Sequence, residues 1–295
     1  MPLTDKVLRF LVNRIPIKTL KSELRRLIFM KYNFYGNENK AVYSTSGENI
    51  LWSIKGLRII VEGDNNLISI GENIIFSDTQ INIFGDNNFI KIDNNTNFLN
   101  SKININGNNN NINFSHNLRF ESIIISMSYN NNLFYMETTP YKPKDAKFYI
   151  EEGSKVYIGK NCELNNLYVV ANCNYTKQHK LVIGDNVRIA KDTIIRTSDG
   201  HTLIDPVTKI ALNEPKDVII GNNVWIASRC IILKGTQILD GSMVAAGSLV
   251  NKNFTERNIM LAGIPARIIR HNILWDKRGY GKYMREFKGN INAET

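Results

Sequence analysis

The chain has 295 residues, of which 43% are hydrophobic and 9% aromatic, and it carries a formal net charge of +10 at pH 7. This length allows one or two domains with a sizeable core. A run of about eighteen or more apolar residues is absent, which excludes a transmembrane helix. The three cysteines, Cys162, Cys173 and Cys230, lack the spacing of metal ligands, and their odd number suits a reducing compartment. We expect no metal site.

Residues 1–40 predict a helical cap. Apolar residues recur at helical spacing on either side of Pro16: Leu8, Leu11, Val12 and Ile15, then Leu20, Leu24, Leu27 and Ile28. Basic residues outnumber acidic ones, so this segment could lie on an anionic membrane surface or hold an acidic polymer. We favour a third interpretation, in which the segment simply covers the open end of a solenoid. Since Arg9, Asn13 and Arg14 interrupt the apolar run, we expect no secretory signal and a cytoplasmic protein, with the inner face of the membrane as an open location.

Residues 41–145 predict a β-solenoid with a repeat of 22 residues. Four similar turn segments begin 22 residues apart: Gly63-Asp64-Asn65-Asn66, Gly85-Asp86-Asn87-Asn88, Gly107-Asn108-Asn109-Asn110 and Tyr129-Asn130-Asn131-Asn132. Aliphatic residues keep the same phase at Ile59, Ile81, Ile103 and Ile125. This fixed phase argues against a disordered low-complexity tract. Stacked turns should align Asn65, Asn87, Asn109 and Asn131 in a hydrogen-bonded amide ladder. The spacing does not decide the handedness, although continuity with the later repeats favours a left-handed coil.

Residues 146–269 show a repeat of six residues. Aliphatic residues occupy every sixth position at Ile220, Ile226, Ile232, Ile238, Val244 and Val250. This period is neither that of a helix nor that of a strand. If each unit is a short strand and a corner, three units close a triangular coil, and residues 18 apart stack above one another. We place the boundary with the preceding block near residue 145 and expect one unbroken rod.

The coil is interrupted once, at residues 199–217, DGHTLIDPVTKIALNEPKD. The six-residue rhythm stops after Ile195 and resumes in phase at Val218. Loops held on rigid frames often carry catalytic groups. Of the four histidines, His201 is the one in this loop, which makes it the candidate catalytic residue.

Four segments together resemble the hexapeptide-repeat acyltransferases, and most closely the sialic-acid and capsule polysaccharide O-acetyltransferases. They are SDGH (198–201), KDVIIGNNVWIAS (216–228), AAGSLVNK (245–252) and LAGIPARIIR (261–270). The resemblance covers about residues 155–272. It implies an all-β fold, a left-handed parallel β-helix, with acetyl-CoA as co-substrate and a homotrimer whose active sites lie between protomers.

The resemblance also implies catalytic roles. His201 corresponds to the family's general base, and a neutral imidazole near pH 7 can accept a proton from an attacking sugar hydroxyl. Asp199 or Asp205 could orient the ring, and the sequence leaves this choice open. The backbone N–H of Ser228 corresponds to an oxyanion donor.

Further residues follow from the same resemblance. Trp225, with Lys216, is placed at the acceptor, although an aromatic residue there could equally cover the coil or an interface. The coenzyme would lie along Ala227, Ala245, Ala246, Asn251, Lys252, Pro265, Ala266, Arg267 and Arg270. This chain has Ala227 where many relatives have glycine, and Asn251 where they have threonine or serine.

Residues 270–295 form a basic tail with interleaved aromatic residues. Such a composition can bind nucleic acid, but the tail carries no nucleic-acid motif. We therefore expect no nucleic-acid partner and a helix packed on the rod or on a neighbour.

The predicted function is O-acetylation of a bacterial surface glycan. The net charge of +10 would attract an acidic polymer, so the carbohydrate acceptor could be acidic. Two alternatives stay open: N-acetylation of a nucleotide-linked amino sugar, and a non-catalytic glycan-binding solenoid. A carbonic-anhydrase-like β-helix would need three clustered histidines, and the sequence offers no such group.

Overall fold

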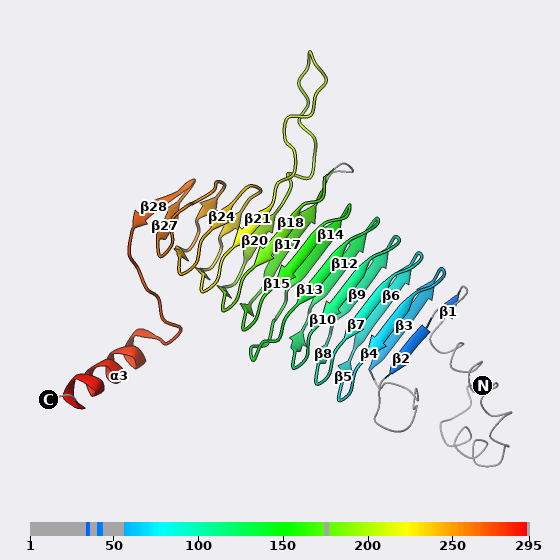
Figure 1. The fold of residues 1–295 in the computed structure, drawn as a ribbon, viewed down its shortest axis with the longest axis horizontal. Coiled ribbons are helices and arrows are strands. Elements are labelled where there is room, and N and C mark those ends of the chain that lie inside the picture. Colours follow the sequence, from blue (N-terminus) through cyan, green and yellow to red (C-terminus); the bar gives the residue numbers. More distant parts are fainter. Residues whose placement is uncertain (1–33, 36–39, 44–55, 174–176, 294–295) are drawn as a thin grey trace.

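The computed structural model describes residues 34–35, 40–43, 56–173 and 177–293, which form a long rod of stacked coils (Figure 1). The predicted helical cap falls mostly on residues 1–33, outside the described residues. Phe34–Tyr35 is already a strand, β1, so the solenoid begins inside the segment predicted as cap. In the described part of the chain, no helix is long and apolar enough to cross a membrane.

The first face of the rod is sheet A, whose strands pair in parallel along its whole length. Its strands, in spatial order, are β1 (Phe34–Tyr35), β3 (Leu57–Glu62), β6 (Thr79–Phe84), β9 (Lys102–Asn106), β12 (Ile124–Ser128), β14 (Lys147–Glu151), β17 (Leu167–Asn172), β20 (Thr193–Arg196), β23 (Ile231–Ile232) and β26 (Leu249–Val250).

The second face is sheet B, which is also parallel. It consists of β2 (Lys40–Tyr43), β4 (Leu67–Ile70), β7 (Phe89–Ile92), β10 (Asn111–Phe114), β13 (Leu133–Met136), β15 (Lys155–Ile158), β18 (Lys180–Ile183), β21 (Val218–Ile220) and β24 (Gln237–Ile238). Both sheets cross residue 145 without a break, as expected for one continuous rod.

The third face combines two sheets joined by bridges of Lys144 to Glu121 and Asn165. Sheet C contains β5 (Ile75–Ser77), β8 (Asn97–Leu99) and β11 (Arg119–Glu121). Sheet D contains β16 (Glu163–Leu164), β19 (Arg188–Ile189), β22 (Trp225–Ile226), β25 (Met243–Val244), β27 (Met260–Gly263) and β28 (Ala266–Arg270). β27 and β28 form an antiparallel hairpin that ends the rod. Helix α3 (Tyr280–Ala293) follows, so the predicted C-terminal helix is present. It stands away from the rod (Figure 1), so the expected packing on the rod is not found within one chain.

The core is the column of inward side chains along the axis of the rod. The aliphatic positions of the six-residue repeat, from Ile220 to Val250, are all buried, as are Ile59, Ile81, Ile103 and Ile125 of the longer repeat. The three cysteines are also buried, and burial raises the pKa of the Cys162 thiol to about 12. The all-β solenoid predicted from the two periodicities is therefore confirmed.

The coils shorten toward the C-terminal end. Leu57 pairs with Thr79, 22 residues later, whereas Ile231 pairs with Leu249, 18 residues later. The difference lies chiefly in sheet A, where β3 has six residues and β23 has two. Because every coil visits the three faces in the same order and stacks in the same direction, the long and short coils share one hand.

The predicted asparagine ladder exists, but its assignment was wrong by one residue. Asn65, Asn87, Asn109 and Asn131 have φ values of 56°, 55°, 58° and 62°, so they supply the left-handed turn conformation that asparagine tolerates well. The buried ladder is formed by the next residue in each coil. Asn88 Nδ2 donates to Asn66 Oδ1 at 3.0 Å, Asn110 to Asn88 at 3.1 Å and Asn132 to Asn110 at 2.9 Å.

Candidate active site

The loop that carries His201 leaves the rod between β20 and β21 and projects far from it (Figure 1). Its two stems are tied together, because Lys216 N donates to Thr197 O at 2.9 Å. The second stem is also fixed by Asp217, whose Oδ1 lies 3.2 Å from Nδ1 of the buried His179. These contacts place the base of the loop on the rigid frame of the rod.

Beyond the base the loop forms a short hairpin. Leu212 N donates to Leu203 O at 2.8 Å, and Asp205 N donates to Ile210 O at 2.9 Å. The carboxylate of Asp205 accepts hydrogen bonds from the backbone N–H groups of Val207 and Thr208, and these bonds lower its pKa. Asp205 is thus occupied in the turn of the hairpin, and it makes no hydrogen bond to the His201 ring in the described chain.

Asp199, the other candidate partner of His201, is also engaged elsewhere. Its Oδ2 lies 2.5 Å from Lys234 Nζ and accepts a bond from Asn213 Nδ2 at 2.8 Å. The ammonium group of Lys234 holds the pKa of Asp199 below its ordinary value. The described hydrogen bonds of Asp199 do not include the imidazole of His201, so in a single chain this carboxylate braces the loop.

Asn213 is the residue that fixes the backbone around His201. Its Nδ2 also donates to His201 O at 2.8 Å, and its Oδ1 accepts from Leu203 N at 2.7 Å. Lys234 Nζ donates to Asn213 O at 2.8 Å, which connects this clamp to the coil after β23. The imidazole of His201 is exposed on a backbone held from both sides.

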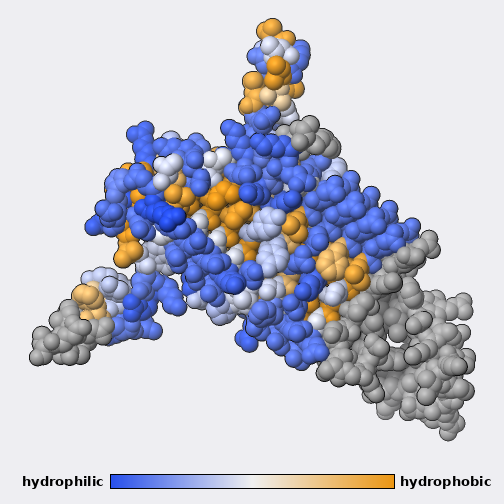
Figure 2. Space-filling model, viewed as in Figure 1, coloured by the Kyte–Doolittle hydropathy of each residue, from blue (hydrophilic) through white to orange (hydrophobic). Residues whose placement is uncertain are grey.

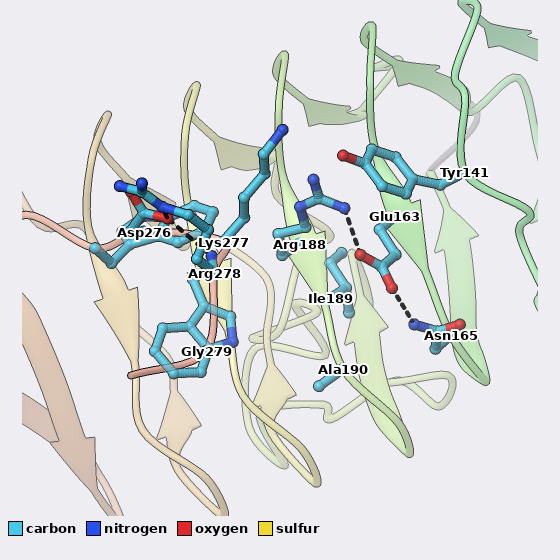
Figure 3. A pocket seen from close by; sticks show the side chains of 12 residues that line it. Tyr141, Glu163, Asn165, Arg188, Ile189, Ala190, Asp276, Lys277, Arg278 and Gly279 are labelled. Carbon is cyan, nitrogen blue, oxygen red and sulfur yellow. Dashed lines mark hydrogen bonds and ion pairs between the residues drawn. The ribbon is translucent and has the colours of Figure 1, made fainter. Parts of the chain in front are cut away.

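Trp225 lies on the outer side of sheet D, with 37% of its surface exposed. Beside it is a pocket of about 450 Å³, lined on one side by side chains of β16, β19 and β22 and on the other by residues 275–279 (Figure 3). Trp225 and Trp275 lie with ring centroids 6.0 Å apart. Arg188 stands over the ring of Tyr141 at 3.7 Å and pairs with Glu163.

The residues predicted to meet the coenzyme lie on the coils that follow β22. Ala245 is half-buried, whereas Ala246, Asn251, Lys252, Pro265, Arg267 and Arg270 are exposed. Ala227 and Ala266 are buried. Ser228 O accepts from Gly247 N at 3.0 Å, while the N–H of Ser228 donates to no acceptor in the part of the chain that the structure describes.

A single chain does not bring the predicted site residues together. Trp225 lines the pocket, but none of residues 199–217 does, and Lys216 is an exposed residue at the loop base. The sequence interpretation missed Arg188 and Trp275. Arg188 could have been found, because it occupies the same repeat position as Trp225, with which it pairs in register. Trp275 follows the last repeat, so no periodicity places it.

Comparison with known proteins shows which family the chain resembles. Residues 217–252 match the protein family described as "Bacterial transferase hexapeptide (six repeats)". The chain is 35% identical over 134 residues to the galactoside O-acetyltransferase of Escherichia coli (strain K12). It is also 35% identical over 126 residues to the polysialic acid O-acetyltransferase of Escherichia coli O1:K1 / APEC. The predicted resemblance to the hexapeptide-repeat acyltransferases is confirmed.

These matches cover parts of the proteins concerned. The first spans 45% of this chain and 63% of the galactoside enzyme, and the second spans 42% of this chain and 39% of the polysialic acid enzyme.

Two solved structures share the fold. The polySia specific acetyltransferase NeuO superposes with a TM-score of 0.58 at 23% identity, covering 85% of this chain and 99% of NeuO. The polysialic acid O-acetyltransferase OatWY superposes with a TM-score of 0.50 at 20% identity, covering 86% of this chain and 96% of OatWY. At these identities the likeness concerns the fold, and it confirms the predicted left-handed parallel β-helix.

Proposed function

We propose that this protein is an acetyl-CoA-dependent O-acetyltransferase that modifies a hydroxyl group of a bacterial surface glycan. The observation that carries the proposal is the long excursion from the coil at residues 199–217. It presents His201 on a braced hairpin, and the coil that follows matches the hexapeptide transferase repeat. Among relatives, both enzymes named above are O-acetyltransferases of carbohydrates by name, which favours a sugar hydroxyl as acceptor over an amino group.

In this mechanism His201 is the general base. Its imidazole would take the proton from the sugar hydroxyl while the oxygen attacks the thioester carbonyl, a contribution of about 10² to 10⁴ in rate. When the C–S bond of the adduct then breaks, the imidazolium would return that proton to the leaving coenzyme A thiolate. The N–H of Ser228, which has no acceptor among the described residues, donates to the carbonyl oxygen as negative charge develops there. Asp199 and Asn213 hold the loop in place, so their effect on the reaction passes through the position of His201.

The coenzyme would lie along the coils after β22. The exposed cations Lys252, Arg267 and Arg270 suit its phosphate groups, and the small side chain of Ala246 leaves space for a chain to approach. Pro265 and the backbone of Ala266 would meet the coenzyme at the end of the rod. In this position the thioester carbonyl would lie near Ser228 and Trp225.

A homotrimer completes the proposed site. The loop with His201 and the pocket with Trp225 are separate within one chain. The tip of the loop exposes large apolar residues, namely Leu203, Ile204, Val207, Ile210 and Leu212 (Figure 2). An apolar tip on an extended hairpin is expected to bury itself against another surface. We propose that it docks on a second copy and brings His201 to that copy's Trp225.

We keep the predicted division of the chain as part of the proposal: an N-terminal cap, a block of long coils to residue 145, a transferase block to 269, and the basic tail. The N-terminal block would hold the polymer or extend the rod. The excess of basic residues in 1–40 suits contact with the inner face of a membrane.

The test is incubation of the protein with acetyl-CoA and a panel of capsule polysaccharides, with detection of free thiol and of the mass of the glycan. His201→Ala should lower transfer by at least about 10²-fold while coenzyme A binding is retained. An amino sugar nucleotide as sole acceptor would favour the N-acetyltransferase. If the unaltered protein releases no thiol with any acceptor, the enzyme proposals fail and the non-catalytic glycan-binding solenoid is the remaining alternative.

A further inference from the structure

The pocket beside Trp225 has a wall made by the C-terminal segment, which lies outside the repeat. Trp275 Nε1 donates to Asn223 O at 2.6 Å, and this bond ties the segment to the turn before β22. Arg278 holds the next turn, because its guanidinium bonds Asp276 at 2.7 Å, pairs with Glu286 and stands over the Tyr283 ring. The segment 275–279, here called the strap, is therefore tied to the rod through Trp275, has its turn fixed by Arg278, and forms one wall of the pocket beside sheet D (Figure 3).

The opposite wall carries a preformed set of polar groups. Asn165 Nδ2 donates to Glu163 Oε1 at 3.2 Å, Glu163 pairs with Nη1 of Arg188, and Arg188 lies on Tyr141 (Figure 3). This chain of contacts fixes the guanidinium plane. The other guanidinium nitrogens of Arg188 make no hydrogen bond to a described residue, so they can donate to a ligand.

The chemistry of the pocket points to a sugar ring. The aromatic rings of Trp225 and Trp275 suit the C–H faces of a pyranose, while carboxylate, amide and guanidinium groups suit its hydroxyl groups. The volume of about 450 Å³ lies within the range of about 300 to 1,000 Å³ that is usual for small-molecule sites. Its open side would let a glycan chain continue out of the pocket.

The charge of the pocket adds a preference. Its lining has three cations, Arg188, Lys277 and Arg278, against two carboxylates, Glu163 and Asp276. Arg188 and Arg278 are paired with those acids, whereas Lys277 forms no ion pair with any described residue. A sugar with an anionic substituent can therefore place that group beside Lys277 without displacing an existing pair.

We propose that the strap 275–279 and sheet D form an acceptor subsite that holds one pyranose unit of the glycan, with Trp275 as a specificity-determining residue. This inference rests on the proposed function for the identity of the ligand. The subsite goes beyond the proposed function because it assigns recognition of the acceptor to the C-terminal tail. This tail carries no repeat and no part of the His201 loop.

The experiment compares Trp275→Ala with Leu274→Ala, a neighbour that is 91% exposed and does not line the pocket. Binding of acidic and neutral oligosaccharides to the full chain is measured by ligand-detected NMR, and the acceptor KM by thiol release. Trp275→Ala should weaken acceptor binding about tenfold and leave the KM for acetyl-CoA unchanged, since one stacking face is lost. Leu274→Ala should match the unaltered protein.

Two further variants make the result independent of folding. Trp275→Phe keeps an aromatic face and should recover most of the binding. Lys277→Gln should weaken acidic oligosaccharides about tenfold and leave neutral ones unchanged.

Equal acceptor binding by Trp275→Ala and Leu274→Ala would overturn the proposal, as would a loss confined to acetyl-CoA or a changed oligomeric state in light scattering. If oligosaccharides bind in a Trp275-dependent way but no acetyl transfer occurs, the subsite stands and the proposed activity fails. If transfer occurs with unaltered KM in every variant, the activity stands and the subsite fails.

Discussion

At the scale of single residues, the loop is controlled by a few polar side chains. Lys234 reaches from the coil after β23 to Asp199 and to the backbone of Asn213, so it joins the loop to a part of the rod that follows it by one coil. Both side chains keep some exposure to solvent, which limits the strength of the ion pair. The loop nevertheless requires the ionised form of Asp199, because its carboxylate accepts from both Lys234 and Asn213.

The first residue-scale prediction concerns the pKa of Asp199, which should lie below 3.8 in the folded chain. A lowered folded pKa means that the ion pair stabilises the loop fully above the ordinary pKa of aspartate, and that this contribution is lost as the pH falls through the lowered value. Carbon-detected NMR titration measures it. Lys234→Met should raise the pKa of Asp199, and Lys252→Met, a control on another turn, should leave it unchanged.

At the scale of elements, each corner of the long coils assigns separate roles to three of its four residues. Gly107 has a φ of 142°, and a Cβ there would lie 1.9 Å from Tyr129 O of the next coil, so the close stacking requires glycine. Asn109 takes the left-handed conformation, and Asn110 turns inward to the ladder. The repeated turn pattern, Gly followed by Asp or Asn and two further Asn residues, is therefore explained by backbone geometry and by hydrogen bonds between coils.

The second prediction compares two neighbouring asparagines. Asn88→Ala removes the acceptor of two Asn110 donors and the donor that bonds Gly107 O, and these groups stay buried. We expect a loss of about 3 kcal/mol in the free energy of unfolding. Asn87→Gly keeps the turn conformation at an exposed position and should change it by less than about 0.5 kcal/mol. Urea unfolding followed by circular dichroism measures both, and similar losses would contradict the ladder.

At the scale of the whole molecule, the rod keeps its catalytic candidate away from its own pocket. The loop tip carries some of the most exposed large apolar side chains of the described chain, with Val207 86% exposed. Figure 2 shows them gathered at the end of the projecting loop, well away from the apolar surface on the rod. The proposed trimer would bury this tip and place His201 of one protomer near Trp225 of its partner.

The third prediction follows from this arrangement. Val207→Asp places a charge in the proposed contact, and it should shift the protein from trimer to monomer in light scattering and abolish transfer. Glu214→Gln changes an exposed polar residue of the same loop and should leave both unchanged. A Val207→Asp variant that stays trimeric, or a monomer with full activity, would refute docking by the loop.

Much of the molecule follows from the sequence alone, because a solenoid repeats local rules. The periods of six and 22 residues predicted the inward columns from Ile59 to Val250, and the interruption after Ile195 predicted the loop. In a stacked coil, neighbours in space lie one fixed interval apart in sequence, so the period itself encodes the contacts. The ladder was misplaced by one residue because spacing alone cannot tell an outward turn residue from an inward one.

The remainder was decided by tertiary structure. The engagement of Asp199 with Lys234, the clamp of Asn213 on His201 and the strap that carries Trp275 join segments separated by unequal intervals. No periodicity reports such contacts, since they depend on the path of a loop and a tail that leave the repeat. The sequence therefore determined the rod and the residue types of its chemistry, and the three-dimensional path of the chain determined which of those residues meet.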